Sequence, residues 1–128
     1  MTDDEALALA VRLVACPRFK PLPGMRDLQG RTWTPDLMWR WNRTIDRPDL
    51  RDPATLGCVL ALVREAYGDP ALYVRLSDTT RQSDGVRAWE VLGWLDPQRS
   101  PDRCAGSWRG WGYASEAEGL VAALEAAP

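Results

Sequence analysis

Apolar residues recur at helical spacing in three segments of the chain. Residues 3–15 follow a Thr2–Glu5 pair that has the form of a capping box. Residues 53–67 are apolar nearly all round, and a third periodic segment begins after Ser115. We therefore expect three helices. Because a helix with almost no polar face must be covered on several sides, we expect the middle one to organise the core.

Alternating apolar and polar residues predict strands between the second and third helices. Residues 71–76 and 86–95 alternate and are separated by a polar loop. In residues 107–114, strict alternation would put Trp111 and Tyr113 on one face of a strand. These segments predict an antiparallel meander that leads into the last helix.

Residues 17–50 are less regular. Their prolines at 17, 21 and 23 exclude a central strand, and residues 27–30 (DLQG) have the composition of a turn that ends in glycine. The stretches RTW and LMWRW, on either side of 34–36, are candidate short strands. The whole chain, residues 1–128, is predicted to be one α+β domain: a mainly antiparallel sheet of about 3–5 strands packed with three helices, with the helix at about 53–67 buried.

Composition argues against catalysis. The chain of 128 residues contains no histidine, so the commonest general base and nitrogen metal ligand are missing. Cys16, Cys58 and Cys104 are far apart in the sequence and lack metal-ligand spacing. No glycine-rich phosphate loop is present either. We predict a protein that is not an enzyme and that carries no metal or cofactor.

Charge and hydropathy set the expected location. The formal net charge is −2, which gives no global attraction to nucleic acid or an anionic membrane. The N-terminal residues are acidic before they become apolar, the reverse of a secretory signal. No apolar run approaches the roughly 18–20 residues that span a bilayer. We expect a cytoplasmic protein without membrane contact.

One segment combines tryptophan and arginine, the residue types enriched at the energetic centres of protein interfaces. We call residues 33–47 the Trp/Arg segment; its candidate partner-binding residues are Trp33, Trp39, Arg40, Trp41, Arg43 and Arg47. Three interpretations remain open: a strand whose tryptophans cover the core, a protein-binding surface, or a surface that stacks bases of single-stranded nucleic acid. Acidic residues at 36, 46 and 49 weigh against a phosphate track.

A second group of aromatic residues belongs to the predicted sheet. Its members are Trp89, Trp108, Arg109, Trp111 and Tyr113. Left uncovered, they would form an exposed aromatic patch of the kind that marks contact sites, although we expect the first helix to cover them. A pocket formed by Trp89, Trp108 and Trp111 would suit a small, nucleotide-like ligand.

Two stretches of the sequence resemble known proteins. "PDLRDPATLGCVLALVREAYGDP" (48–70) and "WRGWGYASEAEGLVAALEAA" (108–127) are similar to a recurring type of small protein encoded by bacteriophages and prophages, which has no assigned activity. The resemblance implies expression inside a bacterial host and action by binding host machinery, defence systems included. The resulting expectation is a non-enzymatic phage-type protein that binds a host or phage protein, with inhibition of antiviral defence as one such role. The alternatives are a single-stranded nucleic-acid-binding module and a small-ligand sequestering protein.

Overall fold

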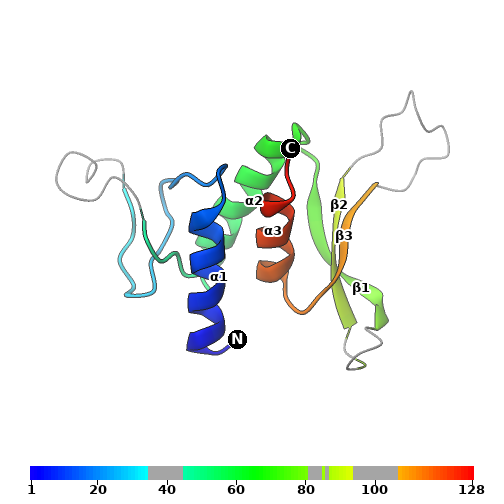
Figure 1. The fold of residues 1–128 in the computed structure, drawn as a ribbon, viewed down its shortest axis with the longest axis horizontal. Helices are drawn as coiled ribbons and strands as arrows, with labels where there is room; N and C mark the ends of the chain where they lie inside the picture. Colours follow the sequence, from blue (N-terminus) through cyan, green and yellow to red (C-terminus); the bar gives the residue numbers. More distant parts are fainter. Residues whose placement is uncertain (35–44, 81–84, 86, 94–106) are drawn as a thin grey trace.

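Two helices precede a three-stranded meander, and a third helix follows it (Figure 1). The computed structural model describes residues 1–34, 45–80, 85, 87–93 and 107–128, and for 78–80 and 107–111 it describes the backbone. The elements are α1 (Asp3–Ala15), α2 (Pro53–Tyr67), β1 (Tyr73–Thr80), β2 (Arg87–Gly93), β3 (Ser107–Tyr113) and α3 (Glu116–Glu125). The predicted α+β class, with three helices and an antiparallel sheet, is confirmed.

The helices begin where their capping residues predict. Thr2 accepts the Glu5 N–H at 3.2 Å, and Glu5 Oε2 accepts the Thr2 N–H at 2.8 Å, which completes the capping box of α1. Gly68 ends α2 with a left-handed φ of 62°. At α3, Ser115 accepts the Glu118 N–H, but the Glu118 carboxylate bonds the N–H of Ala114 rather than that of Ser115. Local side-chain chemistry therefore determines where the helices start.

The sheet has the order β1-β2-β3 with antiparallel pairing throughout. Between β2 and β3 the register shifts twice, so that Trp89 pairs with Tyr113 while its neighbour Glu90 pairs with Trp111. Gly112, at φ 91°, is the additional residue of one bulge. Successive positions of β2 lie on opposite faces of the sheet, so the β3 positions paired with 89 and 90 lie on opposite faces as well. The prediction that positions 111 and 113 share a face is therefore wrong, because the bulge at Gly112 interrupts the alternation.

Helix α3 lies between the sheet on one side and α1 and α2 on the other (Figure 1). It contacts all three strands and both other helices. Six of its 10 residues are buried: Ala117, Gly119, Leu120, Val121, Ala123 and Leu124. A Cβ on Gly119 would stand 3.1 Å from the ring of Tyr113, so a small residue is needed for the sheet to pack this closely. The helix that organises the core is therefore α3, which corrects the expectation for residues 53–67.

Helix α2 supplies one side of the core. Val59, Leu62 and Val63 are buried, and the Tyr67 hydroxyl donates to the Ala123 carbonyl at 2.8 Å, which fastens α2 to the last turn of α3. The solvent-facing side of α2 carries small residues such as Gly57. Small side chains lose little apolar burial by facing water, so an almost wholly apolar helix can keep one side exposed.

Candidate functional site

The ends of the Trp/Arg segment are held by a folded base. We call residues 24–34 and 45–52 the base; residues 35–44, with Trp39, Arg40, Trp41 and Arg43, lie outside the described residues. The base therefore contains the two points at which this segment leaves and rejoins the described structure.

Backbone hydrogen bonds join three short extended pieces within the base. The Trp33 N–H donates to the Met25 carbonyl at 2.7 Å. On the other side of the same central piece, the Leu28 N–H donates to the Arg47 carbonyl at 2.8 Å, and the Asp49 N–H donates to the Arg26 carbonyl at 2.7 Å. Residues 24–28 thus lie between the outgoing end of the segment and its return.

The predicted turn at residues 27–30 is present in the base. Gly30 has φ 83°, and its N–H donates to the Asp27 carbonyl at 2.9 Å. The Asp27 carboxylate accepts the N–H groups of Gln29 and Arg31 and the Arg31 side-chain Nε–H. Burial alone would raise the pKa of Asp27, but these bonds, led by the one from the Arg31 backbone, outweigh burial and hold the pKa below its ordinary value.

Replacing Asp27 with asparagine should make the free energy of unfolding depend less steeply on pH in the acidic range. The lowered pKa of Asp27 means that the folded chain binds this proton less readily than the unfolded chain does. The stabilisation is complete above about pH 4 and is lost as the pH falls through the lower folded-state pKa. Urea unfolding followed from neutral pH to about pH 2 should show a shallower loss of stability for Asp27→Asn than for the wild type.

The matched control is Asp46→Asn, because Asp46 is an exposed aspartate of the base that takes no part in the turn. Its pH profile should follow that of the wild type. If the Asp27→Asn profile did so as well, the hydrogen-bonded carboxylate would not have the role assigned to it.

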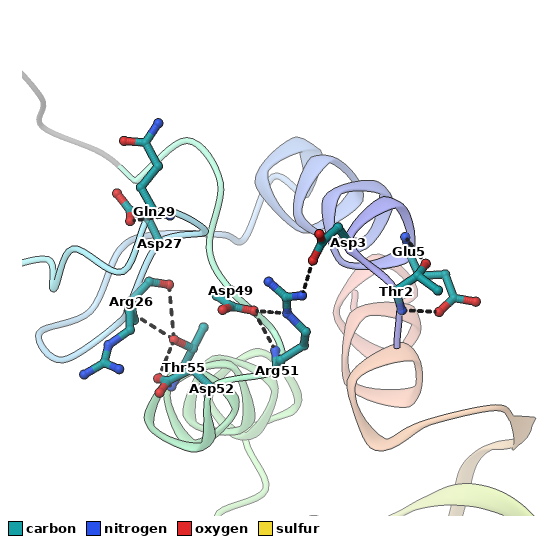
Figure 2. Close-up of polar contacts among 10 residues, drawn as sticks. All are labelled: Thr2, Asp3, Glu5, Arg26, Asp27, Gln29, Asp49, Arg51, Asp52 and Thr55. Carbon is teal, nitrogen blue, oxygen red and sulfur yellow. Dashed lines mark hydrogen bonds and ion pairs between the residues drawn. The ribbon is translucent and has the colours of Figure 1, made fainter.

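Thr55 fastens the base to the first turn of α2 (Figure 2). This fully buried hydroxyl accepts the Arg26 N–H at 2.8 Å. Its single proton is within reach of Asp52 Oδ2 at 3.0 Å and of the Arg26 carbonyl at 3.3 Å. Asp52 Oδ2 also accepts the Thr55 N–H at 2.9 Å as the N-cap of α2. One buried group therefore serves both the helix cap and the base.

Arg51 connects the base to α1 (Figure 2). Its Nε donates to Asp49 Oδ1 at 3.0 Å and its Nη1 to Asp3 Oδ1 at 2.6 Å. The hydrogen bonds to Asp49 and then to Asp3 raise the pKa of Arg51. Because Asp3 is almost fully exposed, this ion pair between the start of α1 and the base adds little stability.

Trp33 belongs to the core. Its side chain is 9% exposed and clusters with Met25, Ile45 and Leu50. Its Nε1–H is buried without a hydrogen-bond partner among the described residues. A ring in this position cannot form part of a partner-binding surface, so the prediction for Trp33 is corrected: burial of its apolar ring anchors the segment instead.

Arg47 is the other member of the predicted set that the structure describes. Its side chain is exposed, and its backbone is fixed by the bond from Leu28. Of the two described members of this set, the structure therefore places Arg47 at the surface and Trp33 in the core. The predictions for Trp39, Arg40, Trp41 and Arg43 remain predictions, because these residues lie outside the described ranges.

The predicted aromatic patch is divided by the fold. Tyr113 packs against the core beside Gly119, and its cross-strand partner Trp89 is half-buried. The helix next to Tyr113 is α3, not the first helix as expected. The side chains of Trp108, Arg109 and Trp111 lie outside the described part of the chain, so the small-ligand pocket that would use Trp89, Trp108 and Trp111 stays a prediction.

Glu90 was not among the residues that sequence reasoning selected. Its side chain is almost fully buried in β2 and its Oε1 lies 2.5 Å from Nε of Arg75, which is exposed on β1. The pair joins directly opposed positions of two strands. Opposite charges at such positions stabilise strand pairing, so this pair has a structural role in holding the meander together.

Two cysteines are described, and burial raises the pKa of both thiols. Cys16 lies against the Arg12 carbonyl and Cys58 against that of Pro23. Over the described ranges, no three His, Cys, Asp or Glu side chains gather closely enough to hold a metal ion. In that same part of the chain, no helix has the length and apolar character needed to cross a membrane.

Comparison with known proteins adds no assignment. No family model, curated protein or solved structure matches this chain.

Proposed function

We propose that the chain is a non-enzymatic, phage-type protein that acts in the bacterial host cell by binding a host or phage protein through the Trp/Arg segment. Inhibition of antiviral defence is one role that such binding would serve. The observation that carries the proposal is the base. It fixes both ends of a segment rich in tryptophan and arginine onto the helical layer.

Holding both ends matters because it lowers the entropy that a recognition loop loses on binding. The outgoing end is anchored by the buried ring of Trp33, and the returning end by the bond between Arg47 and Leu28. The base is in turn fastened to α2 through Thr55 and to α1 through Arg51. In this proposal, the tryptophan rings and guanidinium groups of the segment contact the partner protein.

The charges of the described base favour a protein over a phosphate backbone. Asp27 and Asp49 are paired with Arg31 and Arg51, which reduces the positive charge that these arginines could offer to phosphates. Asp46, next to Arg47, is exposed. A mixed surface of this kind resembles the rim of a protein interface more than a continuous basic track.

The function is tested by capturing partners from a bacterial host lysate with the immobilised chain and identifying them by mass spectrometry. Substituting Trp39→Ala together with Arg43→Ala should remove most of the captured partner, since anchors of these two residue types commonly contribute about 2 kcal/mol or more each. Urea unfolding of the same variant shows whether the fold is intact.

A matched control removes one apolar side chain and one arginine elsewhere. Leu76→Ala with Arg18→Ala meets this need, because both residues are exposed and lie outside the base. The control should capture the partner as the wild type does. Capture that survives in the Trp39/Arg43 variant would reject the site. If the wild-type chain captured no protein but was retained on single-stranded DNA in a salt-dependent way, the nucleic-acid alternative would be favoured.

A further inference from the structure

One edge of the base is open. Residues 24–28 form its central piece, and residues 31–34 run antiparallel along one side of that piece. Trp33 turns both of its backbone groups inward, because its N–H and its carbonyl bond the central piece at 2.7 and 3.2 Å. Backbone groups of successive extended residues point in opposite directions, so those of Thr32 and Thr34 point outward. These outward groups form no hydrogen bond with any described residue.

The opposite edge of the base is blocked. Residues 47–49 pair with the other side of the central piece, and the outward-pointing residue among them is Pro48, directly opposite Asp27. Proline has no N–H to donate, and Pro48 is buried as well. Thr32, in contrast, is exposed, and Thr34 is half-buried. The base therefore offers an extended segment the edge at which the Trp/Arg segment begins.

The side chain behind this open edge is positively charged. Arg26 lies directly opposite Thr32, so the two exposed side chains share one face of the base. Arg26 forms no ion pair with any described residue, and its side chain extends away from Asp49 and Arg51 (Figure 2). Asp49 is already paired with Arg51 at 3.0 Å. An incoming carboxylate is therefore the group that suits this position.

The open edge and the charge together define the kind of occupant. Proteins that accept a strand from a partner bind its backbone along an unpaired edge and select its side chains at alternate positions. A second copy of this chain would bring a second Arg26 to the shared edge instead of a carboxylate. Two identical edges are therefore not complementary in charge, whereas an acidic segment is.

We propose that residues 31–34 bind an extended, acidic segment of the partner protein as an additional strand. The segment pairs with the backbone groups of Thr32 and Thr34 and places a glutamate or aspartate beside Arg26. This inference rests on the proposed function and adds the way in which the partner is held. Within residues 24–33 the pairing engages one further amide, that of Thr32.

The probe is a synthetic peptide of about six residues in which valine and glutamate alternate, the usual length of a strand. Titrated into the ¹⁵N-labelled full-length chain, it should shift the amide signals of Thr32 and Thr34. Thr34→Pro removes an outward N–H without breaking a bond to the described base, and should weaken binding about fivefold to tenfold. The matched variant Thr34→Val keeps this N–H and should bind as the wild type does.

The charge is tested with a second peptide that has lysine in place of glutamate. The wild type should bind the lysine peptide more weakly than the glutamate peptide. Arg26→Gln should reduce this preference, while the bond from its backbone N–H to Thr55 stays in place. The urea midpoint of each variant shows whether the base is intact.

Three results would each overturn the proposal: no shifts at Thr32 and Thr34 with the glutamate peptide, equal affinity of Thr34→Pro and Thr34→Val, or equal binding of the two peptides. A dimer of the chain alone that Thr34→Pro dissociates would also overturn it, because a second copy would then be the occupant. Failure of the proposed function is seen separately, as capture that survives in the Trp39/Arg43 variant.

Discussion

Truncating Leu120 to alanine is expected to lower the free energy of unfolding by about 2–5 kcal/mol, the largest single-residue effect that we predict. Leu120 is fully buried in the middle of α3, the helix that contacts the sheet as well as α1 and α2. Because the sheet packs on one side of α3 and the other two helices pack on the other, the structure can collapse only partly into the cavity that the truncation leaves. Urea unfolding measures the loss through the shift of the midpoint.

Leu60→Ala is the matched comparison, because it removes the same side chain from α2 instead of α3. Leu60 is half-buried on α2, so its truncation should cost clearly less than that of Leu120. Val11→Ala, at an exposed position of α1, should change stability by no more than about 0.5 kcal/mol. A larger loss at Leu60 than at Leu120 would return the organising role to α2 and contradict the layer order described above.

Replacing Thr55 with valine should cost about 1–3 kcal/mol, although the two side chains have nearly the same shape. Valine leaves the Arg26 N–H without its acceptor and removes a hydroxyl that also reaches Asp52. The lost bond is part-buried beside the fully buried Thr55 side chain, so water can replace the hydroxyl as an acceptor only in part. The expected readouts are a lower urea midpoint and faster hydrogen exchange of the Arg26 amide.

Thr55→Ser serves as the control because it keeps the hydroxyl and loses only a methyl group, worth about 0.8 kcal/mol. Exchange at the Arg26 amide should stay slow in this variant. Fast exchange in both variants, or in neither, would show that the hydroxyl does not fasten the base to α2.

The parts of the fold that could be predicted from sequence are those governed by neighbouring residues. Thr2, Asp52 and Ser115 fix the helix starts through bonds to amides three residues along the chain, so their pattern is visible in the sequence. The same holds for the turn that ends at Gly30. Strand existence also followed from alternation, which is a local property.

The rest depends on contacts between distant residues. Residues 53–67 form a longer segment that is apolar nearly all round, yet α3 is central because its small residues let the sheet approach. The bulge at Gly112 changes the register without changing the composition of the strand. The base depends on Thr55 and Arg26, which are 29 residues apart, and nothing in either local sequence signals that bond.

The difference between local and long-range contacts also explains which residues of the candidate site were predicted correctly. Tryptophan and arginine composition selected the segment, but composition cannot tell a ring that covers the core from one that faces a partner. Trp33 proved to be of the first kind, because the paired backbone of Met25 and Trp33 places it in the cluster with Ile45 and Leu50.

The most direct test of partner recognition by the Trp/Arg segment is hydrogen–deuterium exchange of the chain with and without its captured partner. We expect added protection in peptides that cover residues 35–44, with little change in residues 24–33 and 47–56, most of whose amides are already hydrogen-bonded in the base or in the first turn of α2. Added protection confined to other parts of the chain, with none in residues 35–44, would contradict it.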